Sequence, residues 1–228
     1  MVALHILFLR FCYFRHEFFP SREVASALAI SRLGLKVNVM ALVPATENMP
    51  GPSATKPGDI VFARNGVSIE INNTDAEGRL ILADALVYAC EQRPAFILDA
   101  ATLTGAMVVA LGSTHTGFFS RDPKLSDNIR QAAHASGEVV WEMPVNEQHL
   151  KDMKGTFADL SNISSSKGAG SATAAAFLGQ FVSEDIPYAH FDIAGTAWHT
   201  GNRLSYCNKK GASGVLVRTF VEMARASI

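Results

Sequence analysis

The sequence predicts an α/β fold with a mixed, mostly parallel central sheet that is flanked by helices. Runs with the apolar spacing of helices alternate along the chain with short runs of β-branched and aromatic residues, and this alternation is typical of α/β domains. Hydrophobic residues make up 48% of the 228 residues and charged residues 18%, which indicates a well-buried globular protein. No internal repeat or linker interrupts the pattern, so we expect one domain.

The first half of the chain predicts two helices, a strand and a hairpin. Gly34 marks the end of the first helix, and the Asn65-Gly66 dipeptide favours a two-residue hairpin turn. The second helix is apolar nearly all round except at Asp84, which is typical of a buried helix. In chain order, the expected elements are a helix at 24–33, a strand at 37–43, a proline-rich loop at 44–58, a hairpin at 60–63 and 67–71, and a helix at 80–90.

The second half continues the alternation. Apolar residues at helical spacing end at Gly137, and a second such stripe runs from Ala174 to Phe181. In chain order, the expected elements are a strand at 96–98, a Thr/Gly turn, a helix at 105–111, a helix ending at Gly137, a helix at 174–181, a strand at 188–193 and a terminal helix at 217–224.

An octapeptide at 73–80 carries the strongest indication of chemistry. Asp75 and Glu77 stand two residues apart, and Arg79 follows after two more. The block joins a strand to a helix, a junction at which such side chains converge, whereas on a regular helix they would diverge. Paired carboxylates beside a fixed cation suit a divalent metal ion and a developing oxyanion.

A purely structural interpretation of the same residues remains open. Thr74 and Glu77 have the spacing of a capping box. In such a box, the Thr side chain accepts a hydrogen bond from the backbone amide of the N3 residue, and the Glu side chain accepts one from the backbone amide of the N-cap residue. Acidic residues also stabilise a helix N-terminus through the helix dipole. From spacing alone, the capping interpretation is favoured.

The octapeptide NTDAEGRL resembles the signature of the leucine aminopeptidase family, the cytosol-type two-metal exopeptidases. Four further blocks resemble the family in the same order and extend the similarity over roughly 24–228. They are Asn48-Met49-Pro50 with Lys56-Pro57-Gly58-Asp59, the stretch DAATLTGA at 99–106, HFDIAG at 190–195 and GASG at 211–214.

The resemblance implies a zinc-exopeptidase-like fold and assigns roles residue by residue. Asp75 and Glu77 match two metal ligands, and Arg79 matches the catalytic arginine, which holds a bicarbonate. The positions that match substrate-binding residues are Asn73, Ala76, Thr102, Leu103 and Gly105.

For the whole protein, the resemblance implies a metal-dependent aminopeptidase that removes N-terminal, leucine-type residues from peptides. It also implies two divalent ions, manganese or zinc, as cofactors, a homo-hexamer and a cytoplasmic location. The expected division of the chain is an unmatched segment at 1–23 and a partial catalytic domain at 24–228.

One part of the family pattern is missing. The family places a lysine, two aspartates and a second, catalytic lysine before the helix matched at 24–33, in a stretch of the form GKG-x-TFD. Residues before Val24 include Glu17 and Glu23 but no lysine or aspartate. Two carboxylates alone do not complete two coordination shells.

The first twenty residues match nothing in the family. They hold five phenylalanines, while Arg10 and Arg15 interrupt the apolar run, so neither a signal peptide nor a membrane span is supported. Because Met1 to Pro20 shows no period of a regular element, we expect it to pack poorly on the domain.

Composition limits the alternatives. The net charge of −1 includes no basic tract, so nothing supports a nucleic-acid or membrane partner. Three scattered cysteines without a CxxC pair indicate reduced thiols in a cytosolic protein. No HExxH pair occurs, and the isolated His190 and Asp192 are more typical of a structural histidine than of a general base.

Three hypotheses therefore remain from the sequence. The first is a metalloaminopeptidase. The second is a catalytically silent fragment or pseudoenzyme that keeps the fold, and the third is a non-enzymatic binding module on the same fold. The missing lysine–aspartate stretch is the feature that separates the first hypothesis from the other two.

Overall fold

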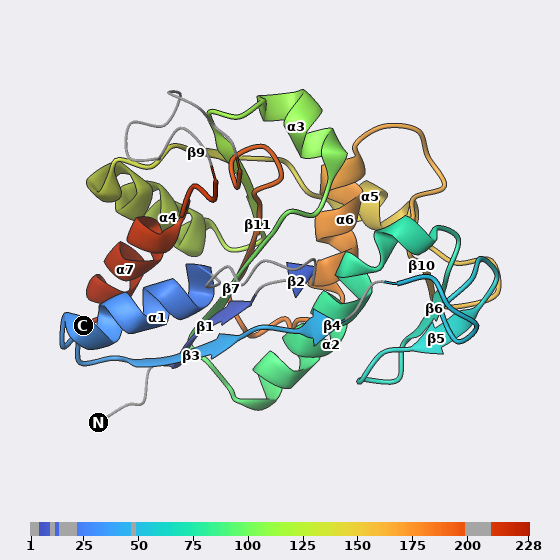
Figure 1. Cartoon of the computed structure of the whole chain (residues 1–228), viewed down its shortest axis with the longest axis horizontal. Coiled ribbons are helices and arrows are strands. Elements are labelled where there is room, and N and C mark those ends of the chain that lie inside the picture. The colour runs from blue at the N-terminus through green and yellow to red at the C-terminus, as the bar shows by residue number, and fades with distance from the viewer. Residues whose placement is uncertain (1–4, 10–11, 14–21, 47–48, 199–210) are drawn as a thin grey trace.

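The structure, a computed structural model, describes residues 5–9, 12–13, 22–46, 49–198 and 211–228 (Figure 1). Of residues 5–9 and 12–13, it describes the backbone alone. The described helices and strands form a mixed α/β arrangement, as the sequence predicts.

A six-stranded sheet lies at the centre of the molecule. Neighbouring strands pair in parallel, except for β11 and β8, which are antiparallel. This confirms the expected mixed, mostly parallel sheet. In spatial order, the strands are β3 (Asn38–Leu42), β1 (His5–Leu9), β7 (Phe96–Ala101), β11 (Tyr188–Asp192), β8 (Thr116–Ser120) and β9 (Val140–Glu142).

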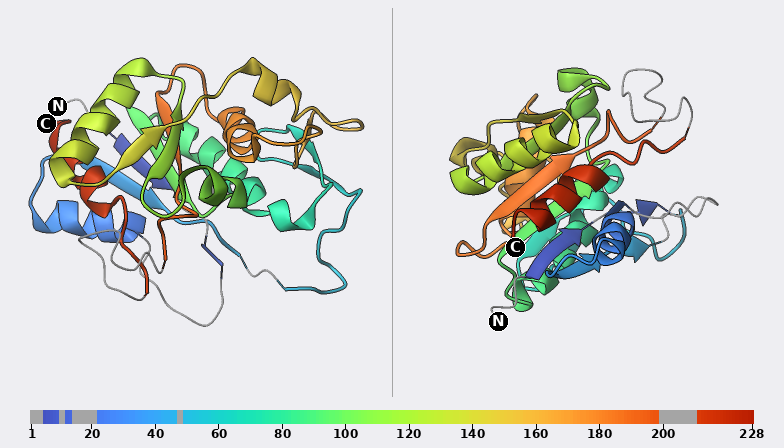
Figure 2. Two further views of the ribbon diagram at one scale, coloured as in Figure 1. Left: turned by 90° about the horizontal axis from the view of Figure 1, so that it is seen from above. Right: turned by 90° about the vertical axis from the view of Figure 1, so that its left-hand side faces the viewer.

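Helices cover both faces of this sheet (Figure 2). One face carries α1 (Arg22–Arg32), α4 (Pro123–Ser136) and α7 (Val217–Arg225), and the other carries α2 (Gly78–Glu91), α3 (Gly105–Leu111) and α6 (Gly170–Gly179). Each face has its own apolar core, with Phe118, Phe191 and Phe220 on the first and Leu82, Leu86 and Phe177 on the second. No helix in the described ranges is both long and apolar enough to cross a membrane.

Two smaller sheets lie beside the central one. The predicted hairpin forms as β5 (Ile60–Phe62) and β6 (Ser68–Glu70), and β10 (Leu160–Ser161) adds to it in parallel. The expected two-residue turn is wrong, because Ala63 pairs with Val67 and leaves a three-residue loop at 64–66. The short strands β2 (Cys12–Tyr13) and β4 (Ala45–Thr46) form the other. The short helix α5 (Glu147–Lys151) packs against α6.

Local chemistry explains where several predicted helices begin and end. The carboxylate of Asp122 accepts a hydrogen bond from the amide of Leu125 (2.7 Å) and caps α4, whose first residue is Pro123. Gly137 ends the same helix in the left-handed region, at φ 71°. Gly105–Leu111 is helical as predicted and is capped by Thr104.

The register of two central strands decides where the polar groups lie. Side chains alternate between the two faces of a strand. On β7, Leu98 packs into the core under α4 and α7, so its neighbour Asp99 faces α2 and α6. On β11, His190 stands directly beside Asp99 and therefore shares that face. A polar column thus runs through an otherwise apolar layer.

The expectation for Met1 to Pro20 is wrong for His5–Leu9. This run forms β1 and pairs in parallel with β3 and β7, in the interior of the central sheet. Five residues without charge suit a strand that has neighbours on both sides, and the run was too short for a period to be recognised. Residues 1–4, 10–11 and 14–20 lie outside the described residues.

Gly195, three residues after the end of β11, allows two loops to approach closely. A β-carbon added there would lie 1.9 Å from the carbonyl oxygen of Gly112. We therefore expect Gly195→Ala to lower the free energy of unfolding by about 1–3 kcal/mol, measured by urea denaturation. Gly179→Ala is the matched control, because a β-carbon there meets no atom within 4 Å. Equal stability of the two variants would contradict the close approach.

Candidate active site

A 3-10 turn precedes the start of α2. Asn73 caps the 3-10 turn η1 (Thr74–Ala76) by accepting a hydrogen bond from the amide of Asp75 (2.9 Å). The α-helix proper then begins at Gly78, with Glu77 at its N-cap position and no side-chain cap bond there. The capping role thus belongs to Asn73, one residue before the Thr74 that the capping-box interpretation predicted.

Asn162 holds this segment from a distant part of the chain. Its side-chain oxygen accepts hydrogen bonds from the amides of Asn72 (2.8 Å) and Asn73 (3.1 Å), and its amide group donates to the carbonyl of Asn73 (2.6 Å). Asn162 is fully buried, so these three bonds are shielded from competing water. Asn162 was not predicted from the sequence, because no local pattern links residues about ninety positions apart.

The two predicted metal ligands share one cleft. Asp75 is exposed and Glu77 is half-buried, and both line an open cleft of about 820 Å³. Lys56 and Asp84 also line this cleft, so its wall carries three carboxylates and one ammonium group. Asp75 and Glu77 therefore lie in one shared, mainly acidic cleft.

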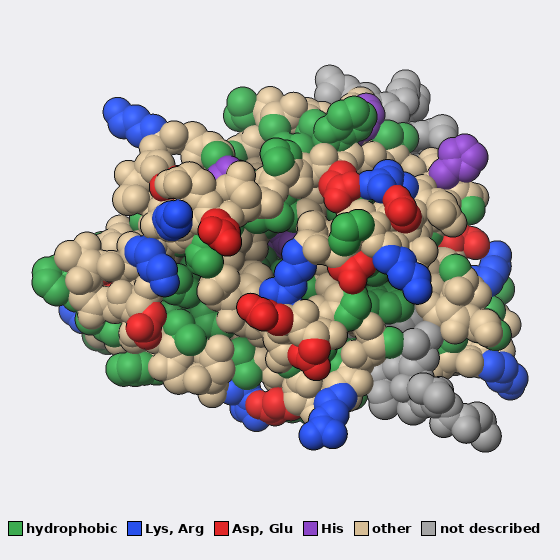
Figure 3. Space-filling view, turned by 180° about the vertical axis from the view of Figure 1, so that it is seen from behind, with side chains coloured by type: hydrophobic (Ala, Val, Ile, Leu, Met, Phe, Trp, Pro, Cys, Tyr) green, Lys and Arg blue, Asp and Glu red, His purple; other side chains and the backbone are tan. Residues whose placement is uncertain are grey.

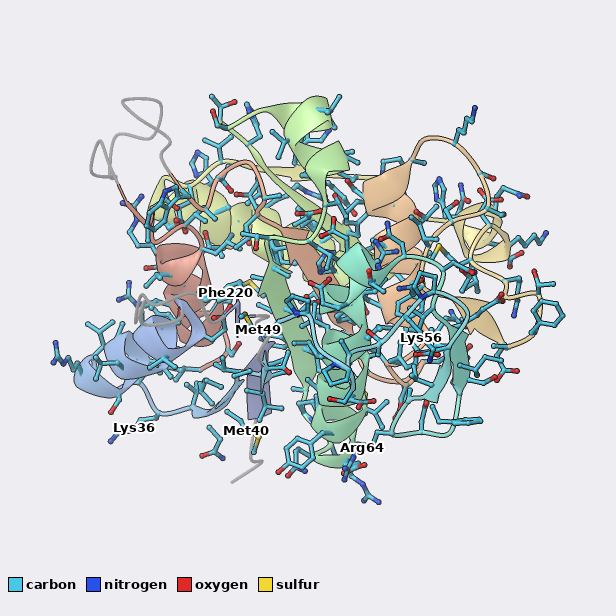
Figure 4. The ribbon with its side chains drawn as sticks, turned by 45° about the vertical axis from the view of Figure 1, so that its right-hand side comes forward. Lys36, Met40, Met49, Lys56, Arg64 and Phe220 are labelled. Carbon is cyan, nitrogen blue, oxygen red and sulfur yellow. The ribbon has the colours of Figure 1, made fainter. Side chains whose placement is uncertain are left out.

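Lys56 is already paired in this cleft. Its ammonium group forms an exposed ion pair with Asp59, three residues further along. Figure 4 shows Lys56 beside the hairpin, Arg64 near the far end of α2, and Lys36 beyond α1 on the other side of the molecule. Arg64 is bound to Glu91 through Nε (2.8 Å).

Arg79 is the buried cation of the site. Its side chain is 8% exposed, and burial lowers its pKa to about 10, while the charges of Asp192 and Glu77 act in the opposite direction. Arg79 is still positively charged at neutral pH, and it lies behind the cleft, close enough to both carboxylates for their charges to act on it. The predicted catalytic residue is thus brought together with one predicted metal ligand.

Of the predicted substrate-binding residues, Asn73 and Ala76 lie at η1, and the other three follow β7, on a turn and at the start of α3. Thr102 and Gly105 are exposed and Leu103 is half-buried, and none of the three lines the cleft that Asp75 and Glu77 share. Thr104 is buried inside the turn and caps α3. The structure therefore separates the predicted site into two groups of residues.

Asp192 connects these two groups. Its Oδ1 accepts hydrogen bonds from the amides of Leu103 (3.2 Å), Thr104 (3.4 Å) and Ala194 (3.2 Å), and its Oδ2 accepts from the hydroxyl of Thr104 (2.5 Å). The same carboxylate acts electrostatically on Arg79. Asp192 is 1% exposed, so its charge is balanced by these donors and by Arg79. From the sequence, Asp192 was only a weak candidate for part of a general base.

His190 has a structural environment, as its sequence context favours. Its Nδ1 donates to Oδ1 of Asp99 (2.7 Å), and the hydroxyl of Tyr188 donates to the other oxygen of Asp99 (2.6 Å). Burial opposes the charged ring, but Asp99 outweighs it, with a further contribution from Asp192, and the pKa of His190 is raised. Burial and the charge of Asp99 raise the pKa of Tyr188 well above its usual value, so Tyr188 remains a neutral donor.

Comparison with known proteins identifies the family. Residues 22–221 match the model of the cytosol aminopeptidase family, catalytic domain. The chain belongs to this family. Two curated relatives described as probable cytosol aminopeptidases support the assignment. The protein of Bdellovibrio bacteriovorus is 66% identical over 202 residues, which are 89% of this chain and 40% of that protein. The protein of Burkholderia mallei is 50% identical over 186 residues, 82% of this chain and 35% of that protein.

Solved structures agree with the family assignment. A mutant of tomato leucine aminopeptidase has a TM-score of 0.86 and 39% identity, and the match covers 98% of this chain and 45% of that one. The bottromycin maturation enzyme BotP in complex with Mn has a TM-score of 0.87 and 31% identity, over 99% of this chain and 54% of that one. The chain spans less than half the length of the two curated relatives named above.

Asp192→Asn tests whether this carboxylate holds the site together. The substitution removes the charge that balances Arg79 and one acceptor of the Thr104 hydroxyl. We expect the free energy of unfolding to fall by about 2–4 kcal/mol and amide exchange at Leu103 and Thr104 to accelerate. Asp185→Asn, at an exposed position, is the matched control and is expected to change stability by less than about 0.5 kcal/mol. Identical exchange in both variants would show that Asp192 does not hold the turn.

Proposed function

We propose that the chain is the partial catalytic domain of a metal-dependent, leucine-type aminopeptidase that removes N-terminal residues from peptides. The single observation that carries this proposal is the placement of Asp75 and Glu77 in one cleft with the buried cation Arg79 behind it. Membership of the cytosol aminopeptidase family supports it. In this proposal, residues 24–228 carry the family pattern, and residues 1–23 lie outside that pattern although they contribute β1 to the central sheet.

The roles of individual residues are part of the proposal. Asp75 and Glu77 are proposed as metal ligands and Arg79 as the catalytic arginine. The resemblance and a solved relative in complex with Mn support divalent ions, manganese or zinc, for the whole protein, with bicarbonate at Arg79. Substrate binding is proposed at Asn73, Ala76, Thr102, Leu103 and Gly105, of which the last three lie on the turn that Asp192 holds.

The carboxylates of the described residues do not complete a two-metal centre. Within 5–9, 12–13, 22–46, 49–198 and 211–228, no group of three or more histidine, cysteine, aspartate or glutamate side chains is arranged to hold a metal ion. Each ion typically needs about 4–6 ligands. This observation favours the second candidate function, a catalytically silent form of the same domain, for the chain as it stands.

Partners and location belong to the whole protein. The description of the relatives as cytosol aminopeptidases supports peptide substrates and a cytoplasmic location, and the family resemblance supports a homo-hexamer. On the face shown in Figure 3, acidic and basic side chains are interspersed, and no basic patch of the kind that binds nucleic acid dominates it.

The 228-residue chain alone is expected to hydrolyse leucine amide close to the background rate. Losing one preorganised electrostatic contact typically costs about 10²–10³ in rate, and this chain lacks several. The measurement is a leucine-amide assay with manganese or zinc titrated to saturation, and Glu77→Ala is the control. Robust metal-dependent turnover that Glu77→Ala abolishes would show that the chain supplies a complete centre and that the silent form is the wrong description.

A chimera tests the proposed function itself. Residues 22–228 of this chain would be joined to the preceding part of the Bdellovibrio bacteriovorus relative, which is 66% identical in the shared region. We expect metal-dependent leucine-amide hydrolysis by the chimera, and a loss of about 10²–10³ in rate in its Glu77→Ala and Arg79→Met variants. A folded, inactive chimera would contradict the roles proposed for Asp75, Glu77 and Arg79.

A further inference from the structure

The hairpin strand β5 has one edge that no other described strand pairs with. It stands at the end of the three-stranded sheet, whose order is β10, β6, β5. On the side of β6, the amide of Ala63 donates to the carbonyl of Val67 (2.9 Å). Because the bonding direction alternates along an antiparallel strand, the amides and carbonyls of Ile60 and Phe62 point to the open edge. An open edge offers backbone donors and acceptors to another chain.

Helix α2 lies on the side of this open edge (Figure 1). Arg64 continues the alternation beyond β5, and its amide donates to Oδ1 of Asp84 on α2 (2.8 Å). At the other end of β5, Ile60 pairs with Glu70, after which the chain leads through η1 into the start of α2. Strand and helix therefore run side by side, with Asp84 at one end of the space between them and the start of α2 at the other.

The cleft that contains the two predicted metal ligands occupies this space. Residues of β5 and of α2 both line it, and residues of the loop at 49–56 add a third wall. Its volume of about 820 Å³ lies near the upper end of the range of about 300–1,000 Å³ that is typical of ligand pockets, so it has room for a short peptide. An extended peptide is the ligand whose main chain can bond along the edge of a strand.

Apolar side chains are exposed along this cleft. Met49 is 70% exposed and Phe62 is 73% exposed, and both line the cleft together with the half-buried Val61, Leu80 and Ile81. Exposed apolar side chains that gather in one place are typical of interaction sites. We therefore expect the occupant to carry apolar side chains, which leave water when it binds.

The charge of the cleft favours a cationic occupant. Three carboxylates line it, with Asp75 and Glu77 at one end and Asp84 at the other. Lys56 also lines it, but its ammonium group is paired with a further carboxylate. Arg79, behind the cleft, offsets part of the charge of Glu77 and leaves the wall acidic. An ammonium group on the occupant would complement the carboxylates at the start of α2.

We propose that the chain binds an extended, apolar peptide segment that carries a lysine, as an added strand on the open edge of β5. The peptide backbone bonds to Ile60 and Phe62, and the lysine ammonium group lies at Asp75 and Glu77. No metal ion takes part in this binding, so its test is independent of the proposed aminopeptidase activity.

The first test titrates acetyl-Lys-Val-Leu-Val-amide into the full chain with EDTA present and follows the backbone amide resonances. Saturable binding is expected to shift the amides of Ile60 and Phe62 and to slow their exchange with solvent. Only alternate amides of an added strand face its neighbour. Methylating either the first and third or the second and fourth peptide nitrogens should therefore weaken binding at least about tenfold in one case only. No binding, or the same effect of both methylations, would overturn the proposal.

Phe62→Pro tests the location. Because the amide of Phe62 points away from β6, proline removes an outward donor together with the ring. Phe62→Ala removes the ring but keeps the donor, so it is the matched control. We expect Phe62→Pro to bind at least about tenfold more weakly than Phe62→Ala, while the amide of Ala63 stays protected in both. Equal binding by the two variants would place the peptide elsewhere and show that the proposal is wrong.

A double-mutant cycle tests the position of the lysine. Norleucine in place of lysine removes the ammonium group and keeps the apolar stem, and Asp75→Asn removes one carboxylate. We expect each change to weaken binding about two- to fivefold, and both together to cost little more than one, because they remove the same ion pair. Asp185→Asn, at an exposed position outside the cleft, is the control and should bind as the parent does. Fully additive losses would place the ammonium group away from Asp75 and contradict the proposal.

Discussion

The buried carboxylate of Asp192 is the constraint on which the candidate site depends. A charge that is 1% exposed is tolerated only when donors and counter-charges surround it. Here the donors are the amides of Leu103, Thr104 and Ala194, and the counter-charge is Arg79. The need to satisfy one carboxylate therefore fixes the turn after β7, the exit of β11 and the start of α2 relative to one another. Three chain segments meet at this point, and two of them carry predicted site residues.

The same principle accounts for the polar column on β11. Tyr188, His190 and Asp192 share one face of this strand because side chains alternate, and the parallel register with β7 places Asp99 beside His190. Asp99 is fully buried and is satisfied by the donors of Tyr188 and His190. A shift of the register by one residue would turn these polar groups to the opposite face of the sheet. The polar contacts therefore specify the pairing of the two central strands.

The sequence predicted the elements whose signals are local. The helix at 105–111 and the pair of strands around Asn65-Gly66 form where expected, because a cap and turn residues act within a few residues, although the loop has three residues instead of two. Strand β1 was missed because its five residues are too short for a period, and its place is decided by β3 and β7. The shared cleft of Asp75 and Glu77, with Arg79 near Glu77, was recognised from spacing and resemblance. Asn162 and Asp192 were not, because each acts across about ninety residues, a distance over which one sequence carries no pattern.

Strand β1 ends at the edge of the sheet where the candidate site lies, but the contacts of Asp192 come from other segments. Because β1 and β7 are parallel, their carboxyl ends reach the same edge of the sheet, where ligands bind in open α/β folds. The turn held by Asp192 lies at that edge, directly after β7. The family pattern places its further ligands in the segment before α1, yet residues 1–23 contain no lysine or aspartate. The hydrogen bonds of Asp192 all come from the segments after β7 and β11. The charged framework around Asp192 therefore does not depend on the segment before α1.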